Sequence, residues 1–303
     1  MQGIAKTPAG IHLFTTNPDC EKLPEKTAQL FHHITAKLLY LCKRTLQDIQ
    51  TAVAFLCTRV KNPDIDDYKK LAHVIQHLWG TQNLTLMIEP GDHPNWWVDS
   101  SYAVHPDMPS HSGIVMMLGK GAVYSSSCKQ KLNTKSSTEA ELVGIDDAMR
   151  QVLWTRHFLA AQGEYVPTTT IYQDNKSTIV LAENGKASSS KRMWHLNVRY
   201  YFVTDQIKKR THEGCILSHT GYGCRFFTKP LQGALFVHMR ERILNLPASK
   251  IASMHRSVLE QRAANTNKDP NKIRENDGNS KADKTRGNSK VIRLMDRSQN
   301  MEK

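Results

Sequence analysis

Three acidic residues in this chain have settings that could bring their carboxylates together. Asp99 lies in Trp-Trp-Val-Asp-Ser-Ser, Glu141 in Ser-Ser-Thr-Glu-Ala-Glu-Leu, and Asp174 in Ile-Tyr-Gln-Asp-Asn. Carboxylates that converge from separate elements can hold two Mg²⁺ ions about 4 Å apart, an arrangement that promotes in-line displacement at phosphorus. Mg²⁺ prefers hard oxygen ligands and keeps several waters, so such a site needs neither Cys nor His. The three residues are therefore candidate ligands of a divalent metal that acts on a phosphodiester.

The strands expected around these residues would place two of them close together. Three stretches have the β-branched or aromatic content of strands, and they cover residues 96–104, 112–118 and 122–127. Gly119-Lys-Gly121 separates the last two stretches and is typical of a hairpin turn. A further β-branched strand over 169–173 ends immediately before Asp174. Asp99 is thus expected inside one strand and Asp174 at the end of another.

A long helix over 136–162 is expected to carry Glu141. A Ser or Thr at 136–138 can cap this helix, because Glu139 or Glu141 follows at the three-residue spacing of a capping box. A second helix is expected over 175–184. The resulting order, β-β-β-α-β-α, indicates an α/β domain that begins with an antiparallel hairpin.

Several motifs in this order resemble the ribonuclease H domain of copia-type retrotransposon polyproteins. They are Trp97-Val-Asp-Ser-Ser-Tyr-Ala103, Lys129-Gln130 ahead of Ser-Ser-Thr-Glu-Ala-Glu-Leu, Asp174-Asn-Lys-Ser-Thr178 and Phe226-Phe-Thr-Lys-Pro-Leu231. The resemblance covers about 92–246 and implies a ribonuclease H-like mixed five-stranded sheet with flanking helices. It also implies that Asp99, Glu141 and Asp174 are catalytic, metal-binding carboxylates for two Mg²⁺ ions, with Mn²⁺ as a substitute. Glu139 is expected to be a first-turn residue favoured by the helix dipole.

The chain departs from this family at one charged position. The family carries a fourth carboxylate shortly before Phe-Phe-Thr-Lys-Pro, and here that stretch reads Thr220-Gly-Tyr-Gly-Cys-Arg225, so Arg225 stands where the carboxylate is expected. A guanidinium stays charged and cannot bind a metal. At about 4 Å from a divalent ion, with an effective dielectric constant near 20, the repulsion is roughly 8 kcal/mol before relaxation. The site is therefore expected to hold two ions as in the family, or one, or none.

The N-terminal third has its own resemblance. Amphipathic helices are expected over 27–42, 48–60 and 66–78. Parts of this region are similar to the thumb and connection of copia-type reverse transcriptases, namely 31–41, 48–53 and 77–81. The Tyr-x-Asp-Asp motif of the polymerase palm has no counterpart in the chain. DNA synthesis is therefore not expected, and the missing palm and fingers would be the natural protein partner.

The charge of the chain favours a nucleic-acid partner. Its formal net charge is +13, which suits a polyanion. Residues 186–212 hold seven Lys/Arg against one acidic residue, and Lys191, Arg192 and Arg199 are candidate contacts to the phosphates of an RNA–DNA hybrid. The alternative for these charges is a solvated helix face, and Phe202 is expected to pack in the core. Four further residues are candidate contacts to nucleic acid, namely Ser126, Lys129, Gln130 and Asn175. For the first three of these, the alternative is that they form the plain end of a strand.

The cysteines and the lack of targeting signals favour an intracellular protein. The six Cys form no Cys-x-x-Cys pair, so reduced thiols are expected. No secretory signal and no apolar run of membrane-spanning length are evident, so neither secretion nor membrane insertion is expected. His73 and His77 have helical spacing, but no metalloprotease Glu follows His73 and a zinc site is not expected.

Two classes of function follow from these features. One is a metal-dependent ribonuclease that degrades the RNA strand of RNA–DNA hybrids, impaired by the loss of the fourth carboxylate at Arg225. The other is a catalytically inactive remnant that keeps the fold and binds nucleic acid. The expected organisation is a flexible N-terminus, thumb/connection-like helices, a ribonuclease H-like domain and a disordered basic tail, covering residues 1–20, 21–90, 91–246 and 247–303.

Overall fold

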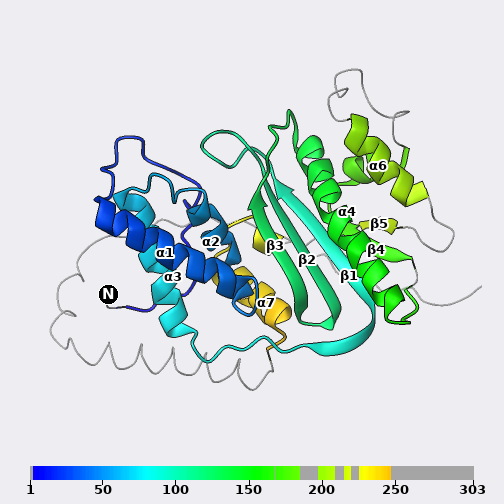
Figure 1. Ribbon diagram of the computed structural model, residues 1–303, viewed down its shortest axis with the longest axis horizontal. Coiled ribbons are helices and arrows are strands. Elements are labelled where there is room, and N and C mark those ends of the chain that lie inside the picture. The colour runs from blue at the N-terminus through cyan, green and yellow to red at the C-terminus, as the bar shows by residue number, and fades with distance from the viewer. Residues whose placement is uncertain (1–2, 167, 185–196, 209–214, 220–224, 247–303) are drawn as a thin grey trace, which may run out of the picture. The chain divides into compact units, whose positions relative to one another are not determined.

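A computed structural model describes residues 3–166, 168–184, 197–208, 215–219 and 225–246. Its centre is a five-stranded sheet of order β3-β2-β1-β4-β5, shown in Figure 1. The strands are β1 (Glu89–Ser101), β2 (His111–Lys120), β3 (Ala122–Lys129), β4 (Thr169–Gln173) and β5 (Cys215–His219). β1, β2 and β3 pair antiparallel, whereas β4 pairs parallel with β1 and β5 parallel with β4. This mixed sheet confirms the predicted ribonuclease H-like fold.

The two faces of the sheet are covered by different helices. Side chains alternate between the faces of a strand, and Trp96 and Ile114 point into a core with Met149 of α4 (Ser137–Ala161). The helices α5 (Lys176–Asn184) and α6 (Asn197–Lys208) complete that layer. On the other face, Val115 and Met117 pack with residues of α7 (Gly233–Leu244) and of η4, the 3₁₀ turn Arg225–Phe227. The predicted core position of Phe202 is wrong, because its side chain is 37% exposed.

The predicted cap fixes the beginning of α4, which carries Glu141. The Ser136 hydroxyl accepts the Glu139 N–H at 3.2 Å, and the Glu139 carboxylate accepts the Lys135 N–H at 2.8 Å. The first contact satisfies an amide group that the first helical turn leaves without a helical partner, and the second ties the residue before the cap to that turn. Glu139 therefore belongs to the cap, as expected, and Glu141 is free to face the sheet.

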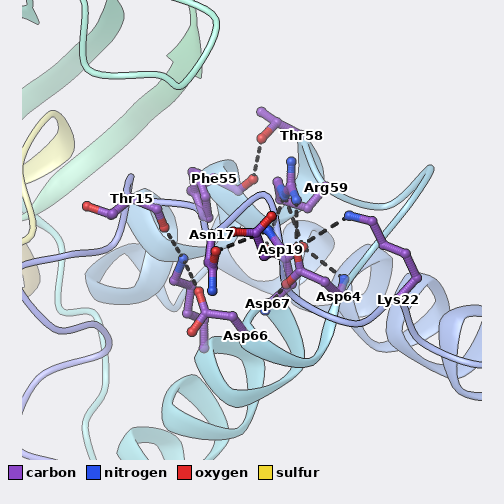
Figure 2. A network of polar contacts seen from close by, with 11 residues as sticks. Thr15, Asn17, Asp19, Lys22, Phe55, Thr58, Arg59, Asp64, Asp66 and Asp67 are labelled. Carbon is purple, nitrogen blue, oxygen red and sulfur yellow. Dashed lines mark hydrogen bonds and ion pairs between the residues drawn. The ribbon is translucent and has the colours of Figure 1, made fainter.

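The N-terminal third forms the predicted helices with small shifts. They are α1 (Glu25–Cys42), a 3₁₀ turn η1 (Gln47–Ile49) that continues into α2 (Gln50–Cys57), and α3 (Ile65–Gly80). Asp64 and Asp67 form a reciprocal capping box at the start of α3. Arg59 lies 3.0 Å from Asp64 and 2.9 Å from Asp67, and Figure 2 shows this guanidinium beside the two acidic residues. The pair of buried acids thus has a cation to balance it.

The helical region and the sheet belong to one compact unit. The side-chain amide of Gln47 donates to the Ala122 carbonyl at 2.9 Å, and that of Gln50 donates to the Ser125 carbonyl at 3.2 Å. Both carbonyls belong to β3, an edge strand of the sheet. An open edge presents unpaired backbone groups, so η1 and α2 cover part of an edge that would otherwise be open.

The two ends of the chain differ in what the structure describes. Residues 3–20, which we expected to be flexible, bury Ala9 and Leu13 in the helical core. The predicted disordered tail over 247–303 lies outside the described residues. Among the described residues, no helix combines the length and the apolar composition that a membrane crossing requires.

Two buried histidines lie where the helical region meets the sheet. His105 Nε2 lies 3.0 Å from His111 Nδ1, and His111 Nε2 lies 2.7 Å from Ser127 Oγ. Ser127 donates its single hydroxyl proton to the Phe227 carbonyl, so the Ser127 oxygen must accept a hydrogen bond from His111 Nε2–H. A neutral His111 then has an unprotonated Nδ1, which accepts a hydrogen bond from His105 Nε2–H. Burial lowers the pKa of His105 to about 4 and, with the neighbouring His105, that of His111 to about 3. Both rings are therefore neutral at pH 7.

This pair should make the protein sensitive to acid. Both folded pKa values lie below the ordinary His pKa of 6.5, so below pH 6.5 the unfolded chain takes up protons that the folded chain excludes. The pair's contribution to the free energy of unfolding therefore falls as the pH drops from about 6.5 toward 4, with a slope approaching ~1.4 kcal/mol per pH unit for each His. Urea unfolding of the wild type and of His111→Gln at pH 7, 6 and 5 measures it.

The Gln side chain keeps a donor for Ser127 but cannot take up a proton, so the variant should show a shallower loss of stability. The exposed His33 provides the matched control, and His33→Gln should follow the wild type. Equal pH slopes for the wild type and His111→Gln would contradict the assignment.

Candidate metal centre

The structure brings the three predicted carboxylates together. Asp99 lies on the central strand β1, Glu141 in the second turn of α4, and Asp174 directly after β4. One carboxylate oxygen from each residue lies within 4.8 Å of the others. Asp99 and Glu141 are each 5% exposed, whereas the Asp174 side chain is 24% exposed. The cluster therefore has two buried candidate ligands and one that reaches the surface.

The pKa values of the clustered carboxyl groups indicate that a bound cation would stabilise their charged forms. Burial, followed by the charges of Asp99 and Asp174, raises the pKa of Glu141 to about 9. Burial also raises the pKa of Asp99, and the hydrogen bond from Thr228 opposes this rise. Hard carboxylate oxygens held this close are the ligands that Mg²⁺ and Mn²⁺ take. The residues present thus fit a divalent ion, which would offset the mutual repulsion of the carboxylates.

Gln173 holds Glu141 in place and was missed by the sequence reasoning. Its side-chain amide donates to Glu141 Oε2 at 3.2 Å, and its amide oxygen accepts the Asn175 N–H at 3.1 Å. Both ends of the amide are therefore engaged, which fixes its orientation. The signal in the sequence is the alternation of side chains along a strand, which places Gln173 on the buried face of β4 together with Thr169 and Ile171. A polar residue on that face, beside an Asp, needs a buried partner.

Arg225 lies at the rim of this cluster. Its Nη2 is 3.1 Å from Asp174 Oδ2, and its side chain is 44% exposed. The guanidinium charge is also one of the influences that lower the pKa of Asp99. A permanent cation thus engages the most accessible of the three carboxylates.

The residues predicted to contact nucleic acid are found in several environments. Gln130 is 2% exposed, and its amide donates to the Ser112 hydroxyl and the Ala140 carbonyl. Ser126 is 9% exposed, and Lys129 pairs with Asp107. Asn175 accepts the Thr178 N–H at the start of α5. The predicted contact of Gln130 with nucleic acid is wrong, because its side chain is buried.

The basic residues of the predicted phosphate-binding stretch cannot be placed. Lys191 and Arg192 lie outside the described residues, as does the side chain of Arg199 in α6. Their predicted contacts to phosphates therefore remain predictions.

No protein-family model matches the chain. Its sequence is 27% identical to the retrovirus-related Pol polyprotein from transposon RE2 of Arabidopsis thaliana over 226 residues, covering 73% of this chain and 15% of that protein. It is 24% identical to the retrovirus-related Pol polyprotein from transposon TNT 1-94 of Nicotiana tabacum over 207 residues, covering 66% of this chain and 15% of that protein.

A comparison with solved structures finds LC11-RNase H1, isolated from compost by a metagenomic approach. It is 12% identical, with 43% of this chain and 84% of that chain covered at a TM-score of 0.33. A likeness at that score adds no support of its own, so the fold assignment rests on the strand order and directions described above. By sequence, the chain is similar to a part of the retrovirus-related Pol polyproteins of these plant transposons, and it spans 15% of the length of each of the two compared.

Proposed function

We propose that this chain carries a copia-type ribonuclease H site that hydrolyses the RNA strand of RNA–DNA hybrids, dependent on Mg²⁺ or Mn²⁺. The observation behind the proposal is the convergence of Asp99, Glu141 and Asp174, with carboxylate oxygens within 4.8 Å of one another. Three carboxylates held this close favour protonation of one of them in the metal-free chain, and a divalent cation would allow all three to be charged.

The residues of the chain would divide the work as follows. Divalent ions bound to the carboxylates would activate a water nucleophile and stabilise negative charge on the leaving 3′ oxygen. Asp99, which is buried on the central strand, would be one of the metal ligands. Glu141 must release the proton that its raised pKa of about 9 retains at pH 7. The hybrid would be selected by its shape and its 2′-hydroxyls, without base readout.

The position of Arg225 supports impaired activity and keeps a second function open. Its guanidinium lies 3.1 Å from Asp174, so it competes with a metal for that carboxylate and repels a cation beside it. A chain in which this competition prevails would be an inactive remnant that binds nucleic acid. Lys191, Arg192 and Arg199 would then hold phosphates without any cleavage.

A hybrid-cleavage assay tests the proposal. The full chain is incubated with an RNA–DNA hybrid labelled on the RNA strand, in Mg²⁺ or in Mn²⁺, with the same sequence as duplex DNA for a control. Slow, metal-dependent cleavage of the RNA strand alone is expected. Binding of the hybrid without cleavage in either metal would support the inactive remnant instead.

The remaining parts of the proposal concern the setting of the chain. The described cysteines Cys20, Cys42, Cys57, Cys128 and Cys215 are free thiols, which suits the intracellular location that we propose. The helical third resembles a thumb and connection, so a polymerase palm with its fingers is the protein partner that we propose.

A further inference from the structure

Asp99 is held by a turn from the far end of the described chain. The buried Thr228 hydroxyl donates to Asp99 Oδ2. The same hydroxyl lies 3.4 Å from the Arg225 carbonyl, but it has a single proton, and a carboxylate is the stronger acceptor. The orientation of the Asp99 carboxylate therefore depends on where the turn at 226–228 places Thr228.

Two hydroxyls from other elements fix the backbone of this turn. Thr51 Oγ1, on α2, donates to the Phe226 carbonyl at 2.8 Å. Ser127 Oγ, on β3, donates to the Phe227 carbonyl at 2.7 Å. All three hydroxyl-bearing residues are nearly buried, with exposures of 6% for Thr51, 5% for Ser127 and 0% for Thr228. Water therefore has little access to replace these hydrogen bonds.

Gly113 allows the turn to lie directly against the sheet. It is the partner of Asp99 in the β1–β2 ladder. A Cβ atom at this position would lie 2.8 Å from Phe227 Cβ and 2.8 Å from Thr228 Cγ2, so the turn is packed at contact distance. A displacement of the turn would therefore be transmitted to Thr228 and to Asp99, because the close packing leaves no space to absorb it.

We infer that Thr51 and Thr228 are positioning residues for Asp99, so that helix α2 sets the geometry of the metal-binding cluster. The path consists of two hydrogen bonds and one turn: Thr51 to Phe226, and Thr228 to Asp99. The inference rests on the proposed function only in taking Asp99 as a metal ligand. It assigns the helical N-terminal third a part in the site, although no residue of that third belongs to the carboxylate cluster.

Binding of Mn²⁺ to the full chain, followed by electron paramagnetic resonance of the free ion at pH 7, tests the inference. Outer-shell partners of metal ligands affect affinity roughly 10- to 100-fold, and a loss of this size is expected for Thr228→Val. Thr51→Val should weaken binding about threefold or more, and the double variant should lose less than the product of the single effects, since the residues act along one path. Thr51→Ser and Thr228→Ser keep the hydroxyl and should bind nearly as the wild type.

Gln47→Met is the matched control for a merely structural role. It removes the Gln47 hydrogen bond from η1 to β3 without touching the turn, so it should lower the melting temperature and leave the Mn²⁺ affinity unchanged. The same measurements are repeated with Arg225→Ala added to the wild type and to every variant, so that the guanidinium no longer competes with Mn²⁺ for Asp174.

The outcomes separate the inference from the proposed function. Equal Mn²⁺ affinity for the wild type and Thr228→Val, or a multiplicative double variant, overturns the inference alone. A chain that binds no Mn²⁺, with or without Arg225, overturns both. The expected affinity losses in a chain that cleaves no hybrid support the inference and contradict the proposed activity.

Discussion

Replacing Arg225 with Asp is expected to raise the rate of hybrid cleavage at least about tenfold, which corresponds to ~1.4 kcal/mol in the barrier. The change removes a cation 3.1 Å from Asp174. It also supplies a carboxylate at the position where copia-type ribonuclease H domains, which this region resembles, have one. Removing the repulsion between a guanidinium and a divalent ion is worth more than this before solvent screening, so tenfold is a conservative figure. Cleavage rates of the two proteins at matched Mg²⁺ provide the measurement.

Three further variants sharpen this result. Arg225→Ala removes the charge without adding a ligand and should give an intermediate rate, whereas Arg225→Lys keeps the charge and should remain slow. Asp99→Asn should abolish cleavage, because the amide removes the central anionic ligand. Robust wild-type cleavage that neither Arg225→Ala nor Arg225→Asp improves would show that Arg225 does not oppose metal binding.

Removing the N-terminal third is expected to unfold the sheet domain. A chain covering 91–246 matches the region of resemblance, but it lacks the hydrogen bonds from Gln47, Gln50 and Thr51 to the sheet and the turn. Each lost hydrogen bond contributes about 0.5–1.5 kcal/mol, and the deletion exposes the edge of β3 to water and to other chains. A loss of a few kcal/mol is a large part of the roughly 5–15 kcal/mol that stabilises a typical domain.

The comparison is between chains covering 91–246 and 3–246, measured by circular dichroism melting and size-exclusion chromatography. We expect cooperative melting for the longer chain, and aggregation or a broad transition for the shorter. A shorter chain that melts cooperatively at the same temperature would show that the helices are dispensable for folding.

The local structure could be predicted because its signals are local. The strand over 169–173 matches β4, and the cap at Ser136 begins α4 as its spacing indicates. The three carboxylates could be grouped because each lies within, or directly after, a recognisable element. The sequence did not indicate what the N-terminal helices pack against, since an apolar stripe shows that a face is buried and not which surface covers it.

Errors arose where polar residues are buried. Gln130 follows a strand and was taken as a surface contact, yet it satisfies hydroxyl and carbonyl groups beneath α4. Thr51 and Gln173 carry no motif of their own, and their roles come from partners far along the chain. Phe202 was assigned to the core from its type alone, although its helix turns that side chain outward. These contacts are tertiary, and the local sequence around each residue does not show which distant residue is its partner.

The raised pKa of Glu141 has a consequence for how sequence drift would affect this chain. Its folded pKa of about 9 exceeds the ordinary Glu pKa of 4.5. The folded, metal-free chain therefore holds a proton that the unfolded chain releases, and stability falls as the pH rises from 4.5 to 9. At neutral pH, a neutral side chain of similar shape at position 141 would fold more favourably. Selection for folding alone would therefore remove this carboxylate, whereas selection for cleavage would retain it.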